Sequence, residues 1–138
     1  MGTHDAYGKH VMQAAAGDAF TESGLQAAVS FGGNGQAHVD GIVGSEIVVE
    51  IESRVAKQVR GAVLDLILHI YPKKLLVLIP VHMHDVEMTA AQCRYILGRF
   101  LDRRNFRVVV LRGTGELPDL ETDSRLVENT LRELGYPT

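Results

Sequence analysis

Two glutamates, Glu50 and Glu52, lie two positions apart in an apolar stretch of the chain, residues 46–52. Side chains alternate between the two faces of a β-strand, so both carboxylates would share one face with Val48. Two carboxylates on one face of an inner strand repel each other and resist burial. A cation bound between the two carboxylates would be the simplest way to offset this repulsion. The pattern therefore predicts a metal site. The alternative is that both side chains lie on a solvated face and take part in no chemistry.

Asp40 adds a third carboxylate from the preceding predicted strand, residues 38–43. A hairpin that turns at residues 44–45 places Asp40 opposite residue 48 or 49. With an even register, Asp40 shares the face of Glu50 and lies diagonal to it, within reach of one cation. An odd register would place Asp40 on the other face. Three carboxylates suit Mg²⁺ or Mn²⁺, which prefer oxygen ligands and can activate a water for attack on a phosphate.

The elements that would position these carboxylates follow from the spacing of apolar residues. The expected order is a helix at 4–16, strands at 25–31, 38–43 and 46–52, a helix at 54–70, a strand at 75–81, a helix at 90–103, a strand at 106–111 and a helix at 122–134. The first three strands should form an antiparallel meander, and the helix after the third makes the third and fourth parallel. This predicts an α/β fold of order α-β-β-β-α-β-α-β-α, with a mixed central sheet flanked by helices.

Length and composition point to one globular domain over residues 1–138. Hydrophobic residues make up 46% of the chain and charged residues 22%, which is enough apolar material for a core. No apolar run approaches the roughly 20 residues that span a bilayer, and no signal peptide is recognisable. The single cysteine, Cys93, excludes an internal disulfide and a cysteine-based zinc site, and its apolar neighbours predict a core position. We therefore expect a cytoplasmic protein without a membrane association.

Charge is distributed unevenly along the chain. Residues 1–53 hold one basic and seven acidic residues, whereas residues 54–112 hold eleven basic and four acidic ones. Residues 113–138 are acidic again, with two basic and six acidic residues. A basic central third beside an acidic first third is compatible with a binding surface next to a metal site, although ordinary solvated helix faces would give the same pattern.

The arrangement around Asp40 and Glu50 resembles the PD-(D/E)XK nuclease superfamily, which includes restriction endonucleases, Holliday-junction resolvases and repair nucleases. The resemblance lies in an Asp on one strand of a hairpin, a Glu-x-Glu near the end of the next, and a helix directly after it. The α-β-β-β-α-β order of residues 4–82 is also similar to the core of that fold. The resemblance implies that Asp40 and Glu50 bind the metal. Glu52 takes the place usually held by Lys and would bind the ion or act as general base. No Pro precedes Asp40, which departs from the pattern.

The same resemblance implies roles for the helix that follows. Lys57, one turn into it, would replace the missing lysine and assist the attacking water, unless it simply faces solvent. Arg54, Gln58 and Arg60 would contact the substrate. Further contacts to backbone phosphates would come from some of Lys73, Lys74 and Arg94. The first helix often supplies another acid in this superfamily, but none is assigned here.

These features together predict a Mg²⁺- or Mn²⁺-dependent endonuclease that hydrolyses DNA and acts as a homodimer. The alternative is a non-catalytic protein on the same fold that binds nucleic acid or acts in assembly, because the motif lysine is missing. The cluster His82-Met83-His84-Asp85 follows the fourth strand. It should lie at the edge of the sheet where Glu52 lies, either as a polar loop, which is the simpler interpretation, or in contact with metal or phosphate.

Overall fold

Strand β5 (Ile47–Glu52) is the central strand of a five-stranded mixed sheet in this computed structural model, which describes residues 3–137. It pairs antiparallel with β4 and parallel with β6, and β6 pairs parallel with β7. The sheet order is β1 (Phe20–Thr21), β4 (Gly41–Val43), β5, β6 (Lys73–Leu78) and β7 (Phe106–Val110). The predicted mixed α/β sheet is therefore confirmed, including the parallel pair that follows from the helix between β5 and β6.

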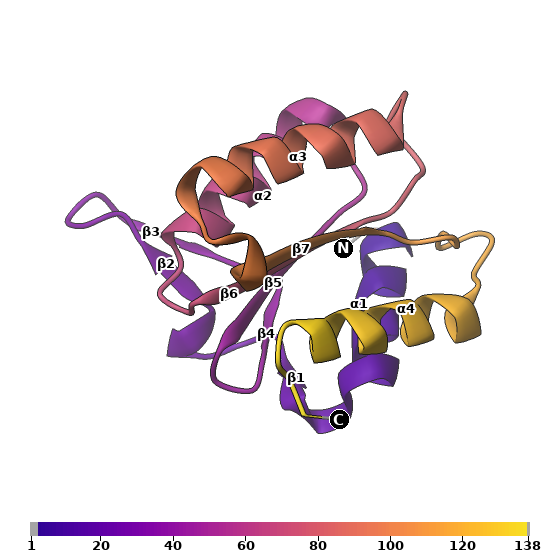
Figure 1. The fold of residues 1–138 in the computed structure, drawn as a ribbon, viewed down its shortest axis with the longest axis horizontal. Helices are drawn as coiled ribbons and strands as arrows, with labels where there is room; N and C mark the ends of the chain where they lie inside the picture. The colour runs from indigo at the N-terminus through magenta and orange to yellow at the C-terminus, as the bar shows by residue number, and fades with distance from the viewer. Residues whose placement is uncertain (1–2, 138) are drawn as a thin grey trace.

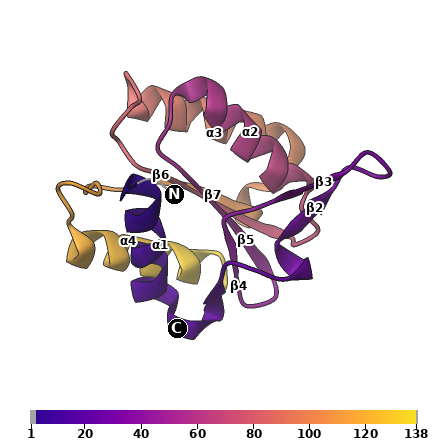
Figure 2. The ribbon, with the colours of Figure 1, turned by 180° about the vertical axis from the view of Figure 1, so that it is seen from behind.

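Helices cover both faces of the sheet (Figures 1 and 2). Helices α1 (Thr3–Ala16) and α4 (Leu120–Glu133) lie on one face, and α2 (Ala56–Leu68) and α3 (Val86–Phe100) lie on the other. Alternation along β5 divides the core in two: Val49 and Ile51 pack toward α1 and α4, whereas Val48 packs toward α2 and α3. No helix within residues 3–137 has the length and apolar character needed to cross a bilayer.

The predicted three-stranded meander is wrong. Strands β2 (Ala28–Ser30) and β3 (Gln36–His38) pair only with each other and form a separate two-stranded sheet. The chain leaves β3 at Val39, whose N–H donates to the Ala27 carbonyl, and re-enters the main sheet at β4. The expected strand at 38–43 is therefore two strands with a break at residues 39–40.

Element boundaries differ from expectation by a few residues, and short segments were missed. Strand β1 has two residues, which is too few to give an alternating pattern, yet it completes the sheet beside β4. The helix expected at 54–70 begins at Ala56 and ends at Leu68. Three short 3₁₀ turns, also not predicted, occupy Gly17–Ala19, Leu25–Ala27 and Arg103–Asn105.

A buried carboxylate on α4 ties the two ends of the described chain together. Asp123 is fully buried and accepts hydrogen bonds from the Tyr7 hydroxyl (2.6 Å) and from the backbone N–H groups of Arg112 (2.7 Å) and Gly113 (2.9 Å). The Tyr7 oxygen in turn accepts from the Asp119 N–H at 3.0 Å. Burial, together with the hydrogen bond to Asp123, raises the pKa of Tyr7 to about 12. This network fixes the loop between β7 and α4 against α1.

Replacing Asp123 should therefore destabilise the whole domain. Asp123→Ala leaves one hydroxyl and two backbone N–H groups buried without their acceptor, which should cost about 3 kcal/mol or more. Urea unfolding measures the free energy directly. Glu121→Ala, an exposed position on the same helix, is the matched control and should change it by less than about 0.5 kcal/mol. A loss below about 1 kcal/mol in Asp123→Ala would contradict this role.

Candidate functional site

Asp40 and Glu50 meet where the regular pairing of β4 with β5 ends. Gly41 is the partner of Val49, so the continued register places Asp40 directly opposite Glu50 rather than diagonal to it as predicted. The Asp40 N–H donates to Glu50 Oε1 at 2.7 Å, and Asp40 Oδ2 accepts from the Ile51 N–H at 2.7 Å. Two carboxylates thus accept backbone N–H groups at the point where the backbone pairing of β4 with β5 ends.

Both glutamates of β5 are buried, so the alternative of a freely solvated face is wrong. Glu50 is 7% exposed and Glu52 is 3% exposed. Alternation places them on the face of β5 that carries Val48, toward α2 and α3. Asp40 is half-buried beside them. The carboxylates are therefore held within the protein at the carboxyl end of the central strand.

The pair Asp40 and Glu50 favours a bound positive charge. Burial and, to a smaller extent, the negative charge of Asp40 raise the pKa of Glu50 to about 9. Burial also raises the pKa of Asp40, and the charges of Asp5 and Glu52 act in the same direction. Asp65 on α2, whose own pKa is raised by burial, adds negative potential at Glu50. A proton or a cation would relieve this repulsion.

Glu52 has a different environment because Arg54 binds it. The Arg54 backbone N–H and Nε both donate to Glu52 Oε1, at 2.9 and 2.6 Å, and a terminal guanidinium nitrogen donates to Oε2 at 2.8 Å. Burial alone would raise the pKa of Glu52, but these hydrogen bonds lower it below its usual value. Glu52 is thus ionised and paired, and any contact with a metal would require Arg54 to move.

Helix α1 brings a further acid to this end of the sheet. The Ser53 hydroxyl donates to Asp5 Oδ1 at 3.3 Å, and the charge of Asp5 raises the pKa of Asp40. No acid of α1 was assigned from the sequence, because Asp5 lies at the start of the helix, 48 residues away from Ser53. The available signal was only that an acid occupies the first turn of a helix.

The histidine cluster lies at the expected edge of the sheet. The Ile79 N–H donates to the Glu52 carbonyl at 3.0 Å, so the end of β6 lies beside the end of β5. In the following loop, the His82 ring packs edge-on against His4 of α1, with 5.5 Å between ring centroids. Asp85 caps α3 by accepting from the Met88 N–H. The cluster behaves as a polar loop that also reaches α1.

Among the described residues, Arg54 is the one predicted basic residue that forms an ion pair with a carboxylate of the site. Lys57, Gln58 and Arg60 are exposed on α2, and the Lys57 side chain makes no ion pair or hydrogen bond with any residue between 3 and 137. The expectation that Lys74 could hold a phosphate is wrong. Lys74 is 3% exposed, its Nζ donates to the His69 carbonyl at 2.6 Å, and burial lowers its pKa to about 8.

The described residues give a two-carboxylate site rather than a preformed multi-ligand cluster. Among residues 3–137, no group of three or more His, Cys, Asp or Glu side chains is placed to hold a metal ion. Comparison of the chain with protein-family models, curated proteins and solved structures gave no match. The candidate site is therefore defined by its geometry and electrostatics alone.

Glu50 should make the stability of the protein depend on pH. Its pKa rises from 4.5 to about 9 on folding, so its stabilising contribution is complete below about pH 4.5 and is lost as pH rises toward 9. Glu50→Gln keeps an acceptor for the Asp40 N–H without a charge. At about pH 8 it should be more stable than wild type by about 1 kcal/mol or more, and at about pH 4.5 equally stable.

Urea unfolding between these pH values measures this difference. Glu46→Gln, an exposed position in the turn before β5, should follow the wild-type profile. Parallel profiles for wild type and Glu50→Gln would mean that Glu50 is already ionised in the folded protein at low pH.

Proposed function

We propose that this protein is a metal-dependent nuclease that hydrolyses DNA phosphodiester bonds, a variant of the PD-(D/E)XK type with Glu52 at the position of the motif lysine. The observation that carries the proposal is the pair formed by Glu50, which is buried near the end of β5, and the half-buried Asp40 opposite it. Two carboxylates with raised pKa values, held against each other by backbone hydrogen bonds, are poised to exchange a proton for a divalent cation.

The donor set fits Mg²⁺ or Mn²⁺. Mg²⁺ is usually bound through one or two carboxylates and substrate phosphates while it keeps several waters, so a cluster of three protein ligands is not required. The hydrogen bonds of Asp40 and Glu50 use Oδ2 and Oε1, which leaves Oδ1 and Oε2 to face a cation. Such an ion would lower the pKa of a bound water and offset the charge that develops on the phosphate.

Neighbouring side chains would complete the chemistry. Arg54 holds Glu52, but its side chain is 66% exposed, so it can exchange this carboxylate for a substrate phosphate. Glu52, once released, would bind the ion or take a proton from the attacking water. Lys57 lies in the first turn of α2, where it would orient the water or offset charge in the transition state, and Gln58 and Arg60 would contact the DNA.

Fold and size support the same proposal. Five strands lie between α1 and α2, and three of them (β1, β4 and β5) belong to the main sheet, whereas β2 and β3 form their own small sheet. The order α1, three strands of the main sheet, α2 and β6 is similar to the α-β-β-β-α-β core expected of that superfamily, which supports the proposal. One domain of this size offers little surface for duplex DNA, so we also propose that the protein acts as a homodimer.

The second candidate is a non-catalytic protein of the same fold that binds nucleic acid or acts in assembly. Two observations favour it: Arg54 neutralises Glu52, and no lysine within residues 3–137 forms an ion pair or a side-chain hydrogen bond with Asp40 or Glu50. Metal binding without turnover would be its signature.

Metal binding should raise the melting temperature through Asp40 and Glu50. At about pH 8 and a tenfold excess over Kd, Mn²⁺ or Mg²⁺ should raise Tm by about 3–5 °C in wild type. The increase should be smaller at about pH 6, because protons compete for the same oxygens. Asp40→Asn and Glu50→Gln should lose most of it, whereas Glu46→Gln should retain it. Equal shifts in all four proteins would place the ion elsewhere.

DNA cleavage separates the two candidates. With Mg²⁺ or Mn²⁺, wild type should cut supercoiled plasmid or a branched DNA, and Glu50→Gln should be slower by about 100-fold or more. Glu46→Gln serves as the matched control, with wild-type activity expected. Cleavage that survives in Glu50→Gln would refute the proposed site. Absence of cleavage with intact DNA binding would establish the non-catalytic candidate instead.

A further inference from the structure

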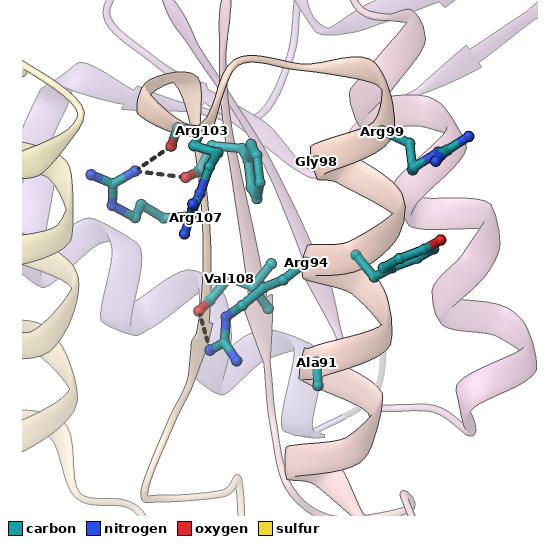
Figure 3. Close-up of a pocket in the computed structure, with 9 residues that line it drawn as sticks. Ala91, Arg94, Gly98, Arg99, Arg103, Arg107 and Val108 are labelled. Carbon is teal, nitrogen blue, oxygen red and sulfur yellow. Dashed lines mark hydrogen bonds between the residues drawn. The ribbon is translucent and has the colours of Figure 1, made fainter.

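An arginine-rich groove lies between α3 and the edge strand β7, near the amino end of that strand (Figure 3). It has a volume of about 600 Å³, and none of its lining residues is acidic. The side chains that matter here are four arginines and two aromatic rings, namely Arg94, Arg99, Arg103, Arg107, Tyr95 and Phe106. In a chain with a net charge of −3, this is a local concentration of positive charge.

Backbone carbonyls hold two of these arginines in place, namely Arg94 and Arg107. Arg94 donates to the Val108 carbonyl at 2.9 Å, and Arg107 donates to the carbonyls of Arg103 and Phe106 at 3.0 and 2.8 Å. Figure 3 shows Arg94, Arg103 and Arg107 on the β7 side of α3, whereas Arg99 points away from β7. Of these three, only Arg107 has a carboxylate partner within the described chain, Glu133. Each guanidinium keeps N–H donors for a ligand.

The same hydrogen bonds decide what kind of ligand fits. As the edge strand, β7 would ordinarily offer its outward carbonyls to an added peptide strand. The carbonyls of Phe106 and Val108 are already bound by Arg107 and Arg94. A ligand in the groove therefore meets guanidinium donors and ring faces rather than a free strand edge. Planar guanidinium groups match phosphate oxygens in geometry and charge.

Tyr95 links the groove to a second hollow that borders α2. Its side chain is 68% exposed, and it also borders a second hollow of about 440 Å³ whose lining includes Arg60 of α2. Helices α2 and α3 pack against each other, so the two hollows lie along one helical layer. The amino end of α2 then leads through Lys57 to Arg54, the partner of Glu52. Toward and just before the amino end of α2 the chain thus carries the basic residues Arg60, Lys57 and Arg54, the last of which binds Glu52.

We propose that this groove binds a single strand of nucleic acid, with Arg94, Arg103 and Arg107 on its phosphates and Tyr95 stacked on a base. An unpaired strand fits better than a duplex, because bases in a duplex are already stacked and cannot lie against Tyr95. This inference rests on the proposed nuclease function and extends it, because the bound strand would be an unpaired arm of the DNA substrate. Binding itself needs neither the metal nor cleavage.

Fluorescence anisotropy with chelator present tests the proposal apart from catalysis. The probe is a labelled oligothymidylate of about 20 nucleotides, compared with a duplex of the same length over a range of salt concentrations. Wild type should bind the single strand more tightly. Arg103→Ala should weaken this binding about three- to tenfold and reduce the salt slope by about 0.7. Tyr95→Ala should weaken it about fivefold or more and leave the slope unchanged.

Matched controls lie elsewhere on the molecule. Arg125→Ala removes an exposed arginine of α4, on the other face of the sheet, and Phe31→Ala removes an exposed ring beyond β2. Both should bind like wild type. Any of three results would overturn the proposal. Arg125→Ala could weaken binding as much as Arg103→Ala does, the duplex could bind as tightly as the single strand, or wild type could show no binding at low salt. If polyglutamate competes equally well for the groove, the proposal is overturned and the ligand is an acidic polypeptide instead. If Glu50→Gln loses cleavage but still binds the single strand, the result supports the groove as a binding site separate from the carboxylates.

Discussion

The central strand has to accommodate two glutamates at an end where both of its edges are hydrogen-bonded and both of its faces are covered. All six residues of β5 are buried, so Glu50 and Glu52 cannot rely on bulk water for solvation. The protein meets this constraint in two ways. Arg54 supplies a full positive charge to Glu52, whereas Glu50 receives one backbone N–H from Asp40 and keeps a raised pKa. This asymmetry leaves one neutralised carboxylate beside a pair that still favours a cation.

The charge blocks along the sequence become separate faces of the folded protein. The acidic first and last segments supply α1 and α4, which pack together on one side of the sheet. The basic central third supplies α2 and α3 on the other side, together with β7 and its arginines. The carboxylates of β5 point toward this second side. An anionic polymer approaching the molecule would therefore be attracted to the face that carries the candidate site.

Regular periodicity in the sequence was sufficient to predict the helices, the parallel pair of β5 with β6 and the burial of Cys93. Periodicity failed at positions where contacts made by side chains, rather than backbone pairing, determine the conformation of the chain. The break at residues 39–40 arises because the Asp40 carboxylate takes the Ile51 N–H, which no pattern of apolar residues reveals. Asp5, the burial of Lys74 and the groove beside β7 all depend on contacts between distant elements. Composition suggested a basic surface but could not show that Lys74 is excluded from it while Arg103 belongs to it.

The hydrogen bond between Tyr7 and Asp123 spans 116 residues of sequence. A growing chain therefore leaves the ribosome with α1 already made but without the helix against which it finally packs. Helix α1 also places Asp5 within hydrogen-bond distance of Ser53. The end of the sheet that holds the carboxylates therefore makes all of its contacts only after α4 has been synthesised and has packed against α1. Assembly of the candidate site is thus coupled to completion of the domain, so that truncated or partly translated chains would lack its full set of contacts.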